Sequence, residues 1–396
     1  LIVRVKHIVN KEDYEDYKIV CNNLSVDGGS FVGALYEIDI TGNTQAGKKE
    51  INLFLKSKVE NEHMKIYSVN DCFVRESFFY NELSKLFTDM QNEVEIPADD
   101  IFKIPKSYDE TDTSVLVLEN LSRRGFKVYP KMEVISLDYA KLSIKELAKF
   151  HALSFALQNK RPDYFDQKIR TLNPLFNFGE DWHGFIQNMF NYSINCLEPD
   201  VKNKVEATIS KKIHDYDKYM CDTKSVRTLC HGDYKHNNVM AKENVSIILH
   251  QLKIFYITTP VSSSTAEFVD YQLLHYGCPI LDFLYFIFNG TDQDFRRKHL
   301  TNLKHLYYNT MKTFLQYFRI DIETVYKKTE FEKDYKEKLD FGLIFNVFFV
   351  PFLFAVEEDV SDLTNRPLSK LAFNVDARFT ERFRGVIDDF IQWGYI

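Results

Sequence analysis

The sequence is poor in the residues that build disulfide frameworks or zinc sites. Its six cysteines are scattered over 396 residues, with no C-x-x-C pair and no histidine at a zinc-ligand spacing. The pattern therefore predicts neither a structural metal site nor a disulfide-stabilised secreted domain. Reduced thiols in a cytoplasmic protein are the simplest interpretation.

The chain also lacks an excess of positive charge. Lys and Arg total 50 against 57 Asp and Glu, which gives a net charge of -7 with neutral histidines. A surface for nucleic acid or for anionic lipid needs a basic field. We therefore expect no nucleic-acid partner, and a neutral or cationic small molecule fits the charge better.

Long hydrophobic runs are missing as well. The most apolar window, from Phe341 to Val356, holds 16 residues and contains Pro351, so it falls short of the ~20 residues that cross a bilayer. We expect it to form a buried helix. The opening stretch LIVRVKHIVNKEDY has too few consecutive apolar residues for a signal-peptide core, so neither secretion nor a membrane span is expected.

Aromatic residues, in contrast, are abundant, with 34 Phe and 23 Tyr, and they favour large packed cores. The first part of the chain has the pattern of β-structure. Three apolar stretches between Ile19 and Val59, separated by turn residues, predict an antiparallel meander. From Cys72 onward apolar residues recur at helical spacing, and a second hairpin is predicted over about 101–120.

Beyond Leu121 helical patterns dominate. The first of these helices places His151 on an apolar face, where we expect a hydrogen-bonded core histidine. The chain is therefore predicted to have an α+β, bilobal fold. Its parts are a β-rich nucleotide-binding lobe over residues 1–118, a hinge over 119–121, and a helical lobe with the catalytic loop over 122–396.

The segment LCHGDYKHNNVM, residues 229–240, carries more polar side chains than a turn needs. Asp233 and Asn238 lie five residues apart with Lys235 between them, and the strand-like EFVDYQ supplies Asp270 downstream. Phosphoryl transfer from ATP uses a carboxylate to orient or deprotonate the acceptor, oxygen ligands for Mg²⁺, and a lysine near the γ-phosphate. The segment thus predicts a kinase site that uses ATP and Mg²⁺.

Candidate phosphate-binding side chains occur in the β-rich part. Lys56 lies on a predicted strand and Glu76 on the following helix, an order in which an ion pair would direct the ammonium to the α- and β-phosphates. Lys58 has the same strand parity as Lys56. Spacing alone therefore leaves the choice between the two lysines open.

Two glycine-containing segments call for different interpretations. Gly28, Gly29 and Ser30, with Gly33, are expected to form a flexible turn whose backbone N–H groups approach the phosphates. The segment GNTQAGKK follows the G-x-x-x-x-G-K pattern, but Lys49 replaces the Ser or Thr that would bind Mg²⁺. Because it leads into a strand, we interpret it as a hairpin turn.

Together these motifs resemble the ecdysteroid kinase-like family of arthropods, also called CHK kinase-like. That family belongs with aminoglycoside phosphotransferases and choline kinases in the protein-kinase-like superfamily. The resemblance runs through nearly the whole chain, in the order GGSFVG, a strand lysine, FVRESFFY, LVLENL, HGDYKHNNVM and VDYQLLHYGCPILDFLYFI. Its most specific parts are H-G-D-x-x-x-x-N, V-D-Y-Q and L-D-F-L.

The resemblance implies roles for the residues that match the C-terminal motifs. It makes Asp233 the catalytic base and places Lys235 beside it in the catalytic loop. Asn238 and Asp270 become Mg²⁺ ligands. Asp282 becomes a structural residue that braces the catalytic loop.

The N-terminal motifs carry the implied nucleotide contacts. Lys56 with Glu76 would hold the phosphates, and Glu119 with Leu121 would form the hinge beside the adenine. Gln272 stands two residues after the metal aspartate, where protein kinases have glycine, which fits small-molecule kinases by resemblance. No activation-loop segment is evident, which also disfavours a protein substrate.

One connection departs from the family pattern. Between Asn238 and Asp270 the family has a short hairpin, whereas residues 245–262 add an apolar stretch with Pro260 and without turn signals. A retained intron is one hypothesis, and comparison of transcript with genome would test it. A genuine insert must bulge from the hairpin without displacing Asp270.

The expected function is transfer of the ATP γ-phosphate to a hydroxyl of a small molecule, and the resemblance points to an ecdysteroid or a related steroid or xenobiotic alcohol. A choline- or aminoglycoside-type kinase and a catalytically inactive nucleotide-binding protein remain as alternatives. No obligate protein partner is predicted. Four aromatic residues of the helical lobe could line an apolar acceptor pocket, although helix packing is the more common use; they are Phe178, Trp182, Phe185 and Phe190.

Overall fold

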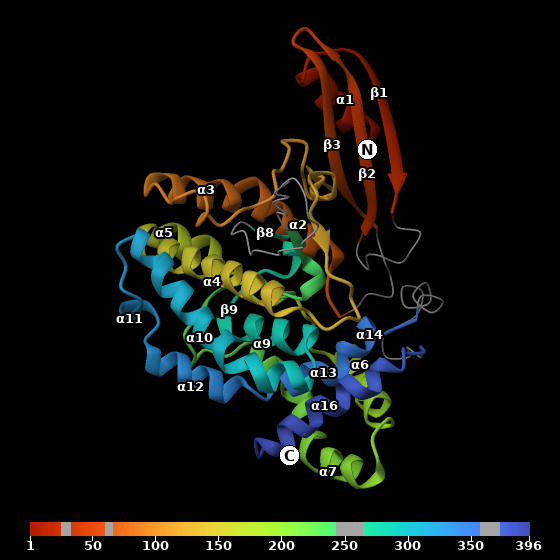
Figure 1. Cartoon of the computed structure of the whole chain (residues 1–396), viewed down its shortest axis with the longest axis vertical. Coiled ribbons are helices and arrows are strands. Elements are labelled where there is room, and N and C mark those ends of the chain that lie inside the picture. The colour runs from red at the N-terminus through yellow and green to blue at the C-terminus, as the bar shows by residue number, and fades with distance from the viewer. Residues whose placement is uncertain (25–32, 60–65, 243–263, 357–372) are drawn as a thin grey trace, which may run out of the picture.

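The computed structural model describes residues 1–24, 33–59, 66–242, 264–356 and 373–396. A twisted sheet projects from one end of a larger helical part, and the C-terminus lies at the opposite end (Figure 1). The sheet has the order β1-β2-β3-β4 and every pair is antiparallel. Its strands are β1 Tyr14–Asn23, β2 Gly33–Thr44, β3 Gly47–Lys58 and β4 Val115–Glu119.

The predicted meander is confirmed, and its strands are longer than expected. The β2–β3 ladder continues to the pair Thr44 and Gly47, so most of the segment GNTQAGKK belongs to the two strands. Gly47 adopts a φ of 111°, which favours glycine. The interpretation of this segment as a hairpin turn is therefore confirmed.

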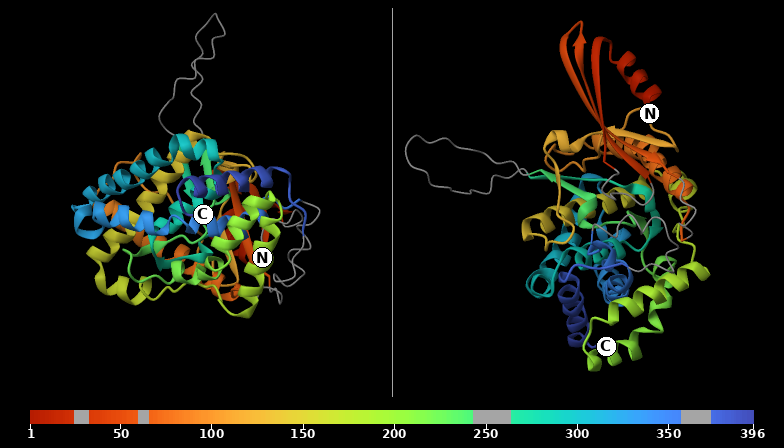
Figure 2. Two further views of the ribbon diagram at one scale, coloured as in Figure 1. Left: turned by 90° about the horizontal axis from the view of Figure 1, so that it is seen from below. Right: turned by 90° about the vertical axis from the view of Figure 1, so that its right-hand side faces the viewer.

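One helix of this lobe was not expected from the sequence. Helix α1, Ile2–Lys11, packs against a face of the sheet (Figure 2, right). Its buried residues Val5, Ile8 and Val9 join a core with the apolar side chains of β2, β3 and β4. The helix thus protects one face of the sheet from water.

The segment after β3 is helical, as predicted. It forms α2 Val69–Phe78, a π-helical turn η2 Phe79–Leu83, and α3 Ser84–Glu93. The hairpin predicted for 101–120 is only partly present, because its first arm makes an isolated bridge from Ser107 to Leu118 and otherwise no ladder. The second arm, β4, pairs with β3 instead.

Helix α2 is attached to the helical part of the molecule. Arg75 donates hydrogen bonds to the backbone carbonyl oxygens of Asn173 and Leu274. Just beyond α2, the ring of Phe79 stacks on Tyr271 with centroids 3.5 Å apart. These contacts join α2 to residues that lie about 100 to 200 positions later in the chain.

Long helices form the second lobe, as the sequence predicts. Helix α4, Leu137–Lys160, packs along α10, Gln293–Tyr317. His151 of α4 is fully buried and bonds to both Tyr307 and Asp282, which confirms the expected core histidine. Within the described ranges, the other helices of eight or more residues are α6 Glu180–Ile194, α7 Pro199–Ile209, α9 Pro279–Gly290, α12 Lys328–Lys338, α13 Phe341–Phe348 and α16 Arg378–Gln392.

The most apolar window is buried but is not one helix. It divides into α13 and the short α14, Val350–Leu353, and Pro351 lies inside α14. A proline lacks the N–H needed to continue the preceding helix. Among the described residues, no helix has the length and apolar character that a membrane crossing requires.

Short strands support the loops between these helices. They form a sheet of order β5-β7-β8 and a pair β6-β9. Their bounds are β5 Lys127–Val128, β6 Thr228–Cys230, β7 Val239–Lys242, β8 Thr265–Phe268 and β9 His275–Gly277. The inserted stretch 245–262, between β7 and β8, lies outside the described residues.

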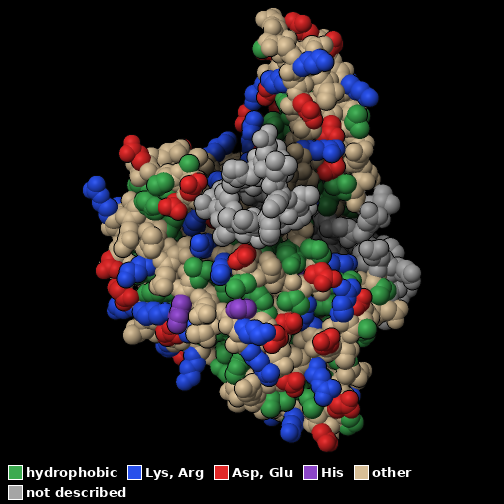
Figure 3. Space-filling model, viewed as in Figure 1, with side chains coloured by type: hydrophobic (Ala, Val, Ile, Leu, Met, Phe, Trp, Pro, Cys, Tyr) green, Lys and Arg blue, Asp and Glu red, His purple; other side chains and the backbone are tan. Residues whose placement is uncertain are grey.

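The expected α+β, bilobal fold is confirmed. All six cysteines are free thiols. On the face shown in Figure 3, the acidic and basic side chains of the described residues are interspersed, in keeping with the modest net charge.

Candidate active site

The structure distinguishes the two candidate strand lysines. The ammonium of Lys56 lies 2.8 Å from Glu76 Oε2, 2.6 Å from Asp270 Oδ1 and 2.9 Å from Gln272 Oε1. Lys58, two residues further, is the last residue of β3 and makes an exposed hydrogen bond to Asn70 at 3.3 Å. Burial and these three partners therefore favour Lys56 over Lys58 as the candidate phosphate lysine.

Glu76 is held at this position by the register of α2. Ser68 caps the helix by accepting the backbone N–H of Asp71, and the buried stripe of α2 then includes Phe73 and Glu76. Burial raises the pKa of Glu76 above its usual range, and the Lys56 charge only partly offsets this effect. The glutamate and Lys56 thus form a desolvated ion pair inside the protein.

Asp270 follows β8 in a backbone conformation that is rare for non-glycine residues. Its φ is 70°, in the left-handed region. Burial would raise the pKa of this carboxyl, but the charges of Lys56 and Lys235 together lower it below the usual range. The side chain is therefore an anion that contacts Lys56 and is further stabilised by the nearby charge of Lys235.

The loop that carries Asp233 is fixed by Asp282 at the start of α9. Its carboxylate accepts the backbone N–H groups of His231 at 2.6 Å and Gly232 at 2.9 Å. Gly232 has a φ of 81°, and a Cβ atom there would lie 2.2 Å from the carbonyl oxygen of Leu273. Burial would raise the pKa of Asp282, but hydrogen bonding from His151 contributes to lowering it.

Asp233 is surrounded by three hydrogen-bond donors. Lys235 Nζ lies 2.8 Å and Asn238 Nδ2 lies 2.9 Å from its Oδ2 atom. The hydroxyl of Tyr285 donates to its Oδ1 atom at 2.6 Å. The aspartate is 5% exposed, so these donors define the orientation of its carboxylate.

Two residues of this cluster, Tyr285 and Gln272, were not predicted to contact the site side chains. Tyr285 lies on α9, where all twelve residues are buried, so apolar periodicity carries no information. The spacing from Asp282 could have predicted this contact. Residues three apart lie on one helix face, so Tyr285 is expected on the same side of α9 as Asp282. For Gln272 the sequence showed only that it stands where protein kinases have glycine, which did not predict its contact with Lys56.

The β7–β8 pairing brings the second half of the site together. Val239 pairs with Phe268, and the N–H of Val269 donates to the carbonyl oxygen of Asn238 at 3.0 Å. Asn238 is thereby fixed beside the strand that leads to Asp270. Since its amide nitrogen bonds to Asp233, its amide oxygen can serve as a ligand of a hard cation together with the Asp270 carboxylate.

The predicted hinge residues have other contacts. The Glu119 carboxylate accepts the N–H of Lys106 at 2.7 Å and pairs with Arg124 at 2.8 Å. Leu121 is 4% exposed and begins the short helix η3, Leu121–Arg124. A hinge contact with adenine would therefore use the backbone. The predicted phosphate-covering residues Gly28, Gly29 and Ser30 lie outside the described residues.

Most of the aromatic residues considered for an acceptor pocket belong to the core. Trp182, Phe185 and Phe190 are 1 to 3% exposed, and the ring of Trp182 lies 5.1 Å from that of Tyr216. Phe178 is partly buried against the same cluster. Their main use is packing between helices, as expected.

Comparison with known proteins assigns this arrangement to a family. The profile of the ecdysteroid kinase-like family matches residues 27–320. The chain belongs to this family. The expected enzyme class, a phosphotransferase with a small-molecule alcohol acceptor, is thereby confirmed. A search of curated proteins finds no match.

Three solved structures are similar to this chain at low identity. A microcompartment-associated aminopropanol kinase has a TM-score of 0.40 and 11% identity, over 99% of this chain and 98% of that one. An amicoumacin kinase, solved with AMP-PNP and Ca²⁺, has a TM-score of 0.31 and 14% identity over 98% and 95%. A glucosamine kinase has a TM-score of 0.32 and 9% identity over 87% and 92%.

Proposed function

We propose that the protein transfers the γ-phosphate of ATP to a hydroxyl group of a small molecule in the cytoplasm, and that the acceptor is an ecdysteroid or a related steroid or xenobiotic alcohol. The proposed division is a nucleotide-binding lobe over residues 1–118, a hinge over 119–121 and a helical lobe over 122–396. The observation that carries the proposal is the 2.6 Å contact between Lys56 and Asp270. It joins the candidate phosphate lysine of one lobe to the candidate metal ligand of the other, 214 residues away.

The residues present fit a magnesium–nucleotide complex. Asn238 and Asp270 offer the hard oxygen ligands that Mg²⁺ prefers, and the bound ion would neutralise charge on the phosphates. Lys56, oriented by Glu76, would contact the α- and β-phosphates. The low pKa of the Asp270 carboxyl keeps it in the ionised form that such a ligand needs.

Asp233 has the surroundings of a proton acceptor. Its carboxylate is oriented by Tyr285, Lys235 and Asn238, so it can orient the acceptor hydroxyl and receive its proton as the oxygen bonds to phosphorus. ADP is then the leaving group. Lys235, also close enough to influence Asp270, would stabilise negative charge on the transferred phosphoryl group.

The test combines binding with turnover. ATP with Mg²⁺ should raise the melting temperature of the full chain, and ATP should be consumed when ecdysone or another alcohol of a steroid and xenobiotic panel is added. The Asp233→Asn variant should retain nucleotide binding and lose turnover by at least ~100-fold. An equal rate in this variant would exclude Asp233 as the base.

The same measurements separate the alternatives. Transfer to choline or an aminoglycoside, but not to uncharged alcohols, would replace the proposed acceptor class. Binding of ATP without turnover on the whole panel would favour an inactive nucleotide-binding protein.

A further inference from the structure

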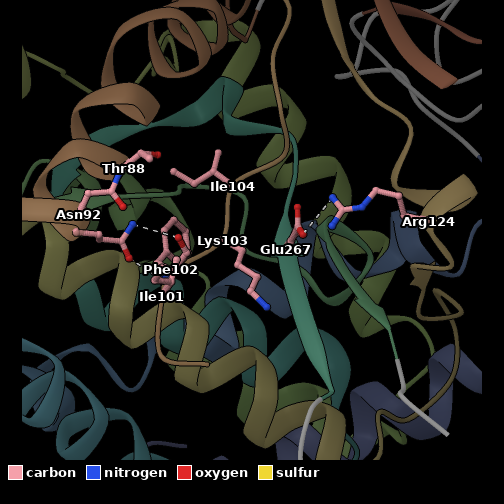
Figure 4. A pocket seen from close by; sticks show the side chains of 9 residues that line it. Thr88, Asn92, Ile101, Phe102, Lys103, Ile104, Arg124 and Glu267 are labelled. Carbon is pink, nitrogen blue, oxygen red and sulfur yellow. Dashed lines mark hydrogen bonds and ion pairs between the residues drawn. The ribbon is translucent and has the colours of Figure 1, made fainter. Parts of the chain in front are cut away.

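A cavity of about 280 Å³ lies beside the hinge, between α3, the segment 101–104, η3 and β8 (Figure 4). None of the residues assigned above to the nucleotide, the metal or the acceptor lines it. Its volume is slightly below the range of drug-sized binding sites. The cavity therefore suits a small ligand at a place separate from the proposed phosphoryl-transfer site.

Glu267 of β8 is the most unusual group in this cavity. The residue is only 2% exposed, and its Oε2 atom has no hydrogen-bond partner within the part of the chain that the structure describes. Its Oε1 atom lies 3.6 Å from Arg124 Nη1, beyond hydrogen-bond range. Glu267 thus has one long ion pair on Oε1 and no donor on Oε2 among the described residues. An unsatisfied buried carboxylate oxygen is costly, so this side chain calls for a donor from a molecule in the cavity.

The other lining groups define the rest of the ligand. Lys103 and Arg124 place two cationic side chains around the same cavity (Figure 4). Arg124 pairs with Glu119 at 2.8 Å and lies 3.6 Å from Glu267, and its side chain is 49% exposed. Ile101 and Ile104 supply apolar wall.

We infer that this cavity binds a small zwitterion, an apolar α-amino acid, with its ammonium on Glu267 and its carboxylate on Lys103 and Arg124. The charges decide the class. A simple cation would satisfy Glu267 but face two positive side chains, and a simple anion would face the buried carboxylate. A zwitterion satisfies both signs, and an apolar side chain fits Ile101 and Ile104.

The ligand class is tested with the full-length protein and a matched set of probes. Ligand-observed NMR with the common amino acids at about 10 mM identifies binders at millimolar affinity. Calorimetry then compares leucine with isoamylamine, which lacks the carboxylate, and isocaproate, which lacks the ammonium. Leucine should bind at least ~10-fold more tightly than either. Absence of binding by every amino acid, or equal binding of the three probes, would overturn the inference.

Variants locate the site independently of any kinase activity. Glu267→Gln should weaken leucine binding about 10-fold or more, because a charge-assisted hydrogen bond is lost. Lys103→Gln should weaken leucine but leave isoamylamine unchanged. Lys298→Gln, an exposed lysine of α10, is the control and should bind like the wild type. Unchanged leucine affinity in both cavity variants would refute the site, and melting curves verify that each variant is folded.

Discussion

The hydroxyl of Tyr285 donates a hydrogen bond to Oδ1 of Asp233 over 2.6 Å. Three residues earlier on the same helix, Asp282 accepts the backbone N–H groups of His231 and Gly232. One turn of α9 therefore fixes both the backbone of the catalytic loop and the side chain of its aspartate. Helix α9, which follows the candidate metal ligand Asp270, thus orients the candidate base.

Removal of the tyrosine hydroxyl should lower turnover. In Tyr285→Phe, Asp233 keeps two of its three donors but loses part of its orientation, so we expect kcat to fall about 10-fold with little change in KM for ATP. Steady-state kinetics with an alcohol that the enzyme phosphorylates would measure kcat and the KM for ATP separately. Tyr308→Phe, which removes a hydroxyl bonded to Glu323 and Tyr326, should leave kcat unaltered. A kcat loss of the same size in both variants would contradict the assignment.

Replacement of Lys56 should have a large effect on catalysis and stability, whereas replacement of Lys58 should have a small one. Lys56→Met leaves Glu76 and Asp270 buried without their cation, so it should reduce kcat/KM by ~100-fold or more and destabilise the fold by about 3 kcal/mol. Lys58→Met should change stability by less than about 0.5 kcal/mol. Denaturant unfolding and ATP titration of the two variants side by side provide the measurement.

The Lys56→Met defect should depend on pH. Burial already raises the pKa of Glu76, and loss of the neighbouring ammonium would raise it further. The variant should therefore take up a proton at this site near neutrality and lose less stability at pH 6 than at pH 8. Equal losses at the two pH values would show that Glu76 stays ionised without Lys56.

The Asp282→Asn substitution should disorder the loop that carries Asp233, although Asp282 itself contacts no substrate in the proposed mechanism. An amide can accept only one of the two backbone N–H groups, and its own N–H₂ would oppose the other donor. We expect a loss of about 2 to 3 kcal/mol in unfolding free energy together with a fall in kcat. Asp334→Asn, at another buried aspartate, which accepts from Val226 and Tyr326, should cost stability and spare kcat.

Glu267 should impose a pH dependence on stability. Burial raises its pKa to about 7, so the folded protein holds this proton more tightly than the unfolded chain. Stability from this group is complete below about pH 4.5 and declines as pH rises towards 7. Glu267→Gln removes the titration, so its advantage over the wild type should grow by roughly 2 kcal/mol from pH 5 to pH 8. Parallel pH curves from urea unfolding would disprove this contribution.

The order of motifs along the sequence predicts much of the site. Asp233, Asn238 and Asp270 lie near one another as the kinase pattern requires, because the β7–β8 pair and a short loop set their positions. Lys56 joins them through a contact with Asp270 that spans 214 residues. The choice between Lys56 and Lys58 depends on which one α2 covers. Strand parity contains no information about that packing.

The features that the sequence did not reveal depend on tertiary contacts. Helix α1 was not predicted, although Val5, Ile8 and Val9 recur at helical spacing and form its buried face. The strands against which this face packs lie later in the chain, so the stretch by itself did not show what would bury it. The cavity around Glu267 is formed by four separate segments. A single acidic residue in a strand gives no sign of such surroundings.

The attachment of α2 by Arg75 and the Phe79–Tyr271 stack has a mechanical consequence. If the sheet swings away from the helical body to admit nucleotide, Glu76 must stay behind with that body while Lys56 travels with β3. The ion pair between Lys56 and Glu76 would then break when the lobes open and re-form when they close. The distance between Lys56 and Glu76 would then report how far the lobes have closed. A pair of spectroscopic labels, one on β3 and one on α2, would measure this distance.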